Sequence, residues 1–152
     1  MPGSDRSWMD RALALAEAAG AAGEVPVGAV IVDPRRGAAL AEAANRVERD
    51  ADPTAHAEML AIREAARRLG TPRLAGCDLY VTLEPCPMCA QAIALARIRR
   101  LYFGAADEKG GGVEHGARIF DRPSCHHRPE IYGGIGEARA AALLRSFFRA
   151  RR

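Results

Sequence analysis

The sequence has no apolar stretch of membrane-spanning length, which would require about 20 residues. Its alanine-rich start contains Asp5, Asp10 and Glu17, so it fits neither a membrane anchor nor a signal peptide. In a chain without an export signal, its four cysteines are expected to be thiols and metal ligands rather than a disulfide framework. We therefore expect a cytoplasmic protein with no membrane contact.

A strong net charge, internal repeats and low-complexity linkers are also missing. The formal net charge is only +3, so overall electrostatics do not require a nucleic-acid partner. A cluster of arginines on one face could still provide the contacts that phosphates need. At 152 residues the chain is long enough for one hydrophobic core and too short for two. We expect residues 1–152 to form a single domain.

Two short motifs supply the residue types of a catalytic metal site. They are HAE at residues 56–58 and PCPMC at residues 85–89. Three potential zinc ligands lie in them: His56, Cys86 and Cys89. A zinc ion with three protein ligands keeps one position open for water, whereas a structural zinc is closed by four. Glu58 remains as an unligated carboxylate.

The spacing within each motif predicts where it lies in the fold. Cys86 and Cys89 are three apart, so they share one face of a helix that the intervening proline can begin. The positive end of the helix dipole there favours the thiolate form. His56 and Glu58 are only two apart, so we place them where the chain enters a helix, with Thr54 as its N-cap. Both motifs then lie at helix starts.

These parts predict hydrolysis of an exocyclic amino group. Zinc lowers the pKa of bound water to about 7, which makes a nucleophile available at neutral pH. Glu58 is expected to take the proton from this water, pass it to a ring nitrogen of the substrate and later protonate the departing amine. The H-x-E and P-C-x-x-C spacing is typical of zinc-dependent nucleobase deaminases. The products would be a deaminated base and ammonia.

Two other interpretations remain open at this point. A closed zinc could be completed by Cys125 together with His126 or His127, which would leave Glu58 without a function. The chain could then be a zinc-stabilised binding module rather than an enzyme.

Hydrophobic periodicity predicts strands that alternate with helices in the second half of the chain, and therefore a three-layer α/β fold. The expected helices are 7–19, 56–69, 86–97 and 135–152, and the expected strands are 25–32, the segment ending near 45, 79–83 and 100–105. Residues 107–134 are rich in Gly, Pro and His and should form a long active-site loop with one short strand.

Most of the chain, from Glu24 to Arg152, resembles the bacterial tRNA-specific adenosine deaminases. The resemblance runs through NRV, DPTAHAEMLAIREA, LYVTLEPCPMCAQAIALARIRRLYFGA and FFRARR. It implies a three-layer α/β/α cytidine-deaminase-like fold with a central mixed sheet of about five strands. It also implies a homodimer, one Zn²⁺ per chain, and conversion of the wobble adenosine of an arginine tRNA to inosine. The expected binding partner of the chain is a tRNA anticodon stem-loop.

The resemblance also assigns expected contacts with the substrate, position by position. Asn45 would hydrogen-bond the target nucleoside, Ala57 would offer its backbone N–H to the purine, and Val27 would pack on the base. Asp107 would meet the sugar-phosphate of the flanking loop nucleotide. The segment GGGVEHGARIF departs from the common family form, which has a Gly-Ser turn there.

The last expected helix combines apolar side chains with a cluster of arginines and ends in FFRARR. It could be an amphipathic helix with a solvated basic end, or a tail whose aromatics stack on bases and whose arginines bind phosphates. In the second case the RNA contacts would be Phe148, Arg149 and Arg152. A free guanine or cytosine deaminase of the same fold would not need this tail, and it is the alternative function.

Overall fold

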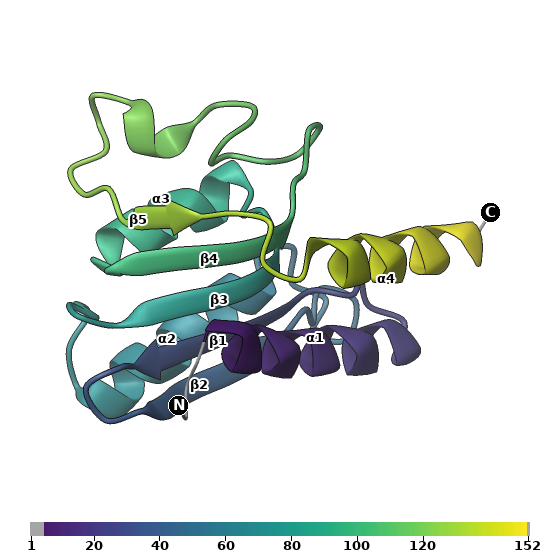
Figure 1. Ribbon diagram of the computed structural model, residues 1–152, viewed down its shortest axis with the longest axis horizontal. Helices are drawn as coiled ribbons and strands as arrows, with labels where there is room; N and C mark the ends of the chain where they lie inside the picture. The colour runs from purple at the N-terminus through teal and green to yellow at the C-terminus, as the bar shows by residue number, and fades with distance from the viewer. Residues whose placement is uncertain (1–4, 152) are drawn as a thin grey trace.

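A five-stranded mixed sheet runs through the computed structural model, which describes residues 5–151 (Figure 1). Its strands are β1 (Gly28–Asp33), β2 (Ala38–Ala44), β3 (Asp78–Leu83), β4 (Arg100–Ala105) and β5 (Glu130–Tyr132). The spatial order is β2-β1-β3-β4-β5. β1 pairs antiparallel with β2 and β3, whereas β4 pairs parallel with β3 and β5. The mixed sheet expected from the family resemblance is confirmed.

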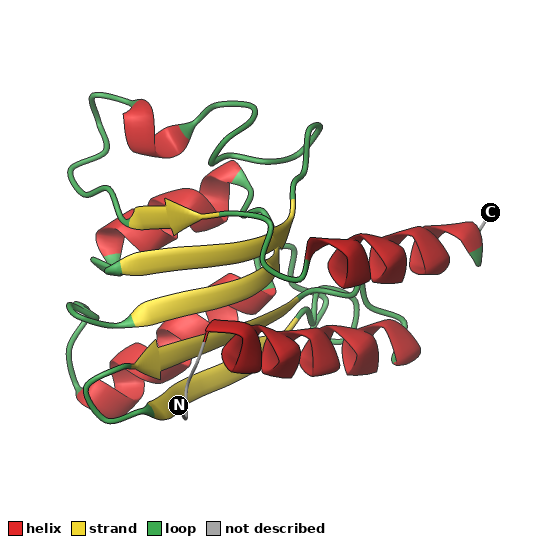
Figure 2. Cartoon of the chain, in the orientation of Figure 1, coloured by secondary structure: helices red, strands yellow, loops and turns green. Residues whose placement is uncertain are grey.

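Within the described residues, four α-helices cover the two faces of the sheet (Figure 2). They are α1 (Asp5–Ala21), α2 (Ala57–Leu69), α3 (Pro87–Leu95) and α4 (Glu137–Arg149). α1 and α4 pack on one face, and α2 and α3 pack on the other. The predicted three-layer α/β/α fold is therefore confirmed. None of the helices in this part of the chain combines the length and hydropathy that crossing a membrane requires.

Successive strand residues point to opposite faces, so each face of the sheet has its own apolar core. The core beneath α1 and α4 includes Met9, Leu13, Val30, Tyr80 and Tyr102. The core against α2 and α3 includes Ile31, Ala61, Leu79, Ile93 and Phe103. Because both faces are covered, the strands near the centre of the sheet are apolar almost throughout.

The start of β1 lies unusually close to α1. A Cβ atom on Gly28 would stand 2.1 Å from the carbonyl oxygen of Ala12, so only a residue without a side chain fits there. This contact holds the beginning of β1, and with it one wall of the functional site, against the first helix.

The start of α2 differs from the prediction. The helix begins at Ala57 and its N-cap position is His56, which makes no side-chain capping bond. Thr54 is not the N-cap, because its N–H and its hydroxyl both donate to the Asp52 carboxylate, each at 2.8 Å. Thr54 therefore closes the preceding turn, a local alternative that short polar side chains readily adopt.

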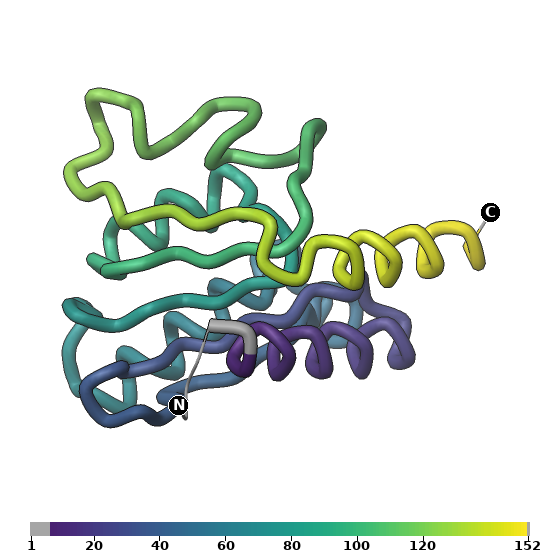
Figure 3. Tube along the Cα trace, in the orientation of Figure 1, coloured from purple at the N-terminus to yellow at the C-terminus, as the bar shows by residue number. Residues whose placement is uncertain are grey.

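The C-terminal part also differs in detail from the expected boundaries. α4 begins at Glu137 rather than Ile135, because Gly136 adopts a left-handed conformation with φ of 71° at the N-cap. The long segment between β4 and β5 contains a short 3₁₀ helix, η1 (Ile119–Asp121), and can be followed as the green tube in Figure 3. η1 packs against α3, so this segment lies beside the helix that carries the PCPMC motif.

Candidate functional site

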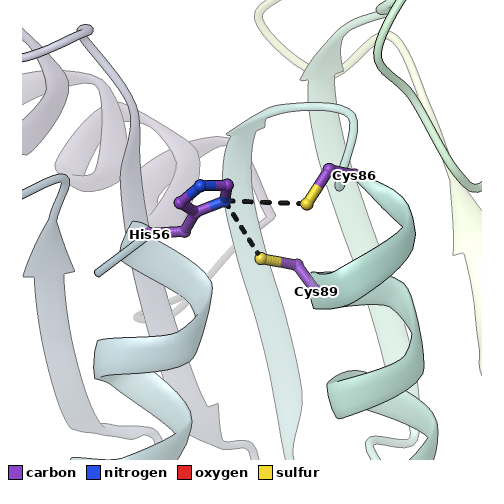
Figure 4. Close-up of side chains that lie close together, drawn as sticks. All are labelled: His56, Cys86 and Cys89. Atoms are coloured by element: carbon purple, nitrogen blue, oxygen red, sulfur yellow. Dashed lines mark hydrogen bonds between the residues drawn. The ribbon is translucent and has the colours of Figure 1, made fainter. Parts of the chain in front are cut away.

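The three expected zinc ligands, His56, Cys86 and Cys89, meet where α2 and α3 begin, and their side chains point toward one another (Figure 4). The Nδ1 atom of His56 lies 3.6 Å from the Sγ of Cys86 and 3.5 Å from the Sγ of Cys89. In a tetrahedral zinc site with bonds of about 2.3 Å to sulfur and about 2.05 Å to nitrogen, the sulfur–nitrogen edge is about 3.6 Å. The donor set and its spacing therefore fit one zinc ion at the centre of the three atoms.

The two thiols have the electrostatics of a cation site. A hydrogen bond from the Cys89 thiol, helped by the nearby His56, lowers the pKa of Cys86 to about 5 against the opposing effect of burial. The same hydrogen bond raises the pKa of Cys89, because it holds the proton on the Cys89 thiol; burial and the neighbouring charges of Glu58 and Cys86, which would repel a second thiolate, raise it as well. A divalent cation would cancel that repulsion and allow both sulfurs to bind as thiolates.

Residues 5–151, which the structure describes, place no fourth protein ligand at this centre. Among the described residues, the group close enough to hold a metal consists of His56, Cys86 and Cys89. Cys125 instead donates its thiol to the His127 carbonyl oxygen at 3.2 Å, and the Nε2 of His127 lies 2.7 Å from the Ile98 carbonyl oxygen. The closed arrangement with Cys125 therefore does not form in this structure.

Glu58 lies in the first turn of α2 and is only 4% exposed. Burial raises the pKa of this carboxyl to about 7. A carboxyl group whose pKa lies near neutrality can both accept and return a proton at neutral pH. Glu58 is therefore suited to proton transfer beside the three-ligand centre.

A cavity of about 570 Å³ opens beside the candidate centre and is lined by His56, Glu58 and Cys86. Three residues expected to contact the substrate also line it: Val27, Asn45 and Asp107. The structure thus brings together residues from the start of β1, the end of β2, both helix starts and the segment after β4. A volume of this size is in the range of small-molecule sites.

Ala57, whose backbone N–H is expected to contact the purine, has a hydrogen-bond partner for that group within the chain. Its backbone N–H donates to the Oδ1 atom of Asn45 at 2.8 Å, and Ala57 is fully buried. Because an N–H can donate only to the amide oxygen, this bond fixes the orientation of the Asn45 side chain and leaves its NH₂ group available to the cavity. Ala57 therefore orients Asn45 in this structure.

Two residues of the basic tail line the cavity, and neither is among the three that are expected to contact RNA. Phe148 is 50% exposed, Arg149 is exposed as well, and Arg152 lies outside the described residues. Phe147 and Arg151 line the cavity instead, and the Arg151 guanidinium lies 3.5 Å from the Phe147 ring centre. Their spacing of four residues is the sequence signal that could have identified them, since it places both on one side of the helix.

Two buried acidic residues in the cavity wall were not identified from the sequence. Glu24 accepts the backbone N–H groups of Glu48 and Arg49 at 3.0 and 2.8 Å. Burial alone would raise the pKa of Glu84, but hydrogen bonds from the backbone of Asp107 and from His115 hold this pKa below its usual value. Each carboxylate thus binds the backbone of a loop beside the cavity. Neither has a local motif that would reveal its partners.

Comparison with known protein families identifies the general class of enzyme to which the chain belongs. A family model described as the cytidine and deoxycytidylate deaminase zinc-binding region matches residues 2–105. The matched range contains both motifs and covers more than half of the chain. The fold and site are those of a deaminase, so the chain is an enzyme and not only a zinc-stabilised binding module.

Individual relatives narrow this class. The tRNA-specific adenosine deaminase of Agrobacterium fabrum is 54% identical over 145 residues, which cover 95% of this chain and 94% of that protein. A solved structure from a study of A-to-I editing by tRNA:A34 deaminases at the wobble position of transfer RNA has a TM-score of 0.88 and 53% identity, covering 91% of this chain and 99% of that one. A guanine deaminase from Nitrosomonas europaea has a TM-score of 0.80 and 27% identity, covering 95% of this chain and 84% of its own. The chain therefore belongs to the cytidine and deoxycytidylate deaminase family and, within it, to the tRNA-specific adenosine deaminases.

Proposed function

We propose that this enzyme deaminates adenosine to inosine at the wobble position of a tRNA anticodon loop and releases ammonia. One juxtaposition supports the chemistry: an open three-ligand centre and the buried Glu58 line the same cavity. The similarity to a tRNA-specific adenosine deaminase over 95% of the chain supports the RNA substrate.

In this proposal His56, Cys86 and Cys89 would hold one zinc ion, which when bound would supply an activated water as the nucleophile. Glu58 accepts the proton of the attacking water and delivers it to a ring nitrogen of adenine. The carboxylate then takes the remaining proton from the hydroxyl added to the ring carbon and gives it to the amino group, so that the C–N bond breaks, a carbonyl forms and ammonia leaves. The raised pKa of Glu58, about 7, allows the carboxyl to act in both directions at neutral pH.

The remaining cavity residues would bind and orient the nucleoside. The Asn45 amide donates its NH₂ to an acceptor on the base, and Val27 packs against the ring. Asp107, which also lines the cavity, would face the sugar-phosphate of a flanking nucleotide. A base within an RNA loop must be turned out of its stack to enter such a site, so its neighbours have to be held by stacking and phosphate contacts. Phe147 and Arg151 are suited to these contacts.

We further propose an arginine tRNA as the substrate, a homodimer and a cytoplasmic location. The first two rest on the family resemblance. Four unpaired cysteines fit a reducing compartment.

The alternative is a deaminase of free bases, and the guanine deaminase of Nitrosomonas europaea gives it support because it shares the fold. The test is to incubate the enzyme with an adenosine-containing anticodon stem-loop and, separately, with free adenosine, guanine and cytidine, and to measure inosine and ammonia. A stem-loop carrying guanosine at the wobble position is the matched control. We expect product only from the adenosine stem-loop. Deamination of free guanine or cytidine with no reaction of the stem-loop would establish the alternative.

A further inference from the structure

The carboxylate of Glu84 is 2% exposed and binds five donors of one loop. Its Oε2 atom accepts three consecutive backbone N–H groups, those of Val113, Glu114 and His115, at 3.2, 2.9 and 3.1 Å. Its Oε1 atom accepts the N–H of Asp107 at 3.0 Å and lies 2.8 Å from the Nδ1 of His115. A buried carboxylate and buried N–H groups are both costly unless they are paired. The loop and Glu84 therefore depend on each other.

The same loop lies directly on the beginning of α3. The Gly112 N–H donates to the Pro85 carbonyl oxygen at 2.8 Å. A Cβ atom on Gly112 would stand 2.6 Å from the backbone nitrogen of Pro87, and one on Gly111 would stand 2.5 Å from the Oε2 of Glu84. Glycine at these positions permits both close approaches. Glu84 thus holds the loop against the segment that carries Cys86.

The loop also places one wall of the cavity. Asp107 lines the cavity, its N–H is bound by Glu84, and its own carboxylate accepts the Gly110 N–H at 2.8 Å. The position of the Asp107 side chain therefore follows from the position of the loop backbone. No bond of Glu84 reaches an expected zinc ligand among the contacts described for it.

We propose that Glu84 is a positioning residue for the RNA substrate, which it serves by holding the loop so that Asp107 stands in the cavity wall. This inference rests on the proposed function. Without the carboxylate, the loop would occupy several conformations, and only a fraction would be competent to bind. The apparent affinity for the RNA then falls to that fraction of its original value. The rate within the bound complex is unchanged, because Glu84 does not touch the reacting atoms.

The test variant is Glu84→Gln, which has nearly the same size and shape. Its NH₂ group cannot accept a backbone N–H, so either the Asp107 bond or the three consecutive bonds must be lost. We expect KM for the adenosine stem-loop to rise at least about tenfold. We also expect kcat to stay within about twofold and the zinc content to remain that of the unmutated enzyme.

Asp33→Asn is the matched control. Asp33 is also a buried carboxylate that accepts a backbone N–H, from Arg35 at 3.0 Å, but it lies at the far end of β1 from the cavity. It should lower stability without changing KM. Amide hydrogen exchange provides a readout independent of activity: in Glu84→Gln, exchange should accelerate at least about tenfold at residue 107 or at residues 113–115, whichever lose their acceptor, and in Asp33→Asn it should accelerate at neither place.

The outcomes are distinct. Unchanged KM, or a fall in kcat together with zinc loss, would overturn the positioning role. If the unmutated enzyme does not deaminate the stem-loop, the proposed function fails. Exchange then decides about Glu84 alone: faster exchange at residue 107 or at residues 113–115 supports its hold on the loop, and unchanged exchange at both refutes it.

Discussion

Replacing Asn45 by alanine and by aspartate separates two tasks of one side chain. Its Oδ1 atom accepts the buried Ala57 N–H at 2.8 Å, while its NH₂ group is available to the cavity. Alanine removes both the acceptor and the donor. Aspartate keeps an acceptor for Ala57 and lies near the N-terminus of α2, where the helix dipole favours negative charge. It has no NH₂ to donate to a base.

The two variants should therefore differ in stability and agree in activity. A buried N–H without an acceptor costs about 1–3 kcal/mol. Because each kcal/mol lowers Tm by about 2–4 °C in a chain of this length, Asn45→Ala should unfold about 2–12 °C lower. Asn45→Asp should stay within about 2 °C of the unmutated enzyme. In both, loss of the donor to the substrate should lower kcat/KM for the stem-loop about tenfold to a hundredfold.

Thermal unfolding and steady-state kinetics on the adenosine stem-loop measure these effects, and zinc content controls for the integrity of the centre. Full kcat/KM in Asn45→Asp would show that the amide donor is not used. An unchanged Tm in Asn45→Ala would show that the bond to Ala57 contributes nothing to the fold.

Three further predictions concern the centre, the tail and the core. Cys86→Ala should lose both zinc and turnover, as measured by metal analysis of the purified variant, and full zinc content there would disprove its role as a ligand. Phe147→Ala should weaken stem-loop binding about tenfold or more through lost stacking, whereas the exposed Phe148→Ala should not, and equal effects would argue against Phe147 as the contact. Gly28→Ala should destabilise the fold by at least about 1–3 kcal/mol, because its Cβ would stand 2.1 Å from the Ala12 carbonyl oxygen; an unchanged midpoint in a denaturant titration would contradict this.

Sequence reasoning could place the candidate ligands because the relevant signals are local. A proline between two cysteines three apart predicts a helix start with both sulfurs on one face, and α3 begins at Pro87. Short continuous apolar runs likewise predicted the central strands, since both faces of the sheet are covered by helices. These features depend on neighbours within one turn or one strand.

The parts that sequence reasoning missed depend on contacts between distant residues. The partners of Glu84 lie 23 to 31 residues later in the chain, and Ala57 bonds an asparagine 12 residues earlier. Neither spacing has a periodicity that could be recognised in advance. Thr54 shows a different limit: it is a good N-cap by type, but the Asp52 carboxylate two residues away takes its N–H and its hydroxyl.

The central claim is that an open zinc centre and an unligated carboxylate work together, and Glu58→Gln tests it most directly. The measurement combines zinc content with the rate of inosine formation in the adenosine stem-loop, for this variant beside the unmutated enzyme. The account predicts unchanged zinc content and a rate lower by about 10²–10⁴, the contribution of a positioned acid-base group. Loss of zinc would make Glu58 part of the metal centre. An undiminished rate would show that the proton is carried by another group.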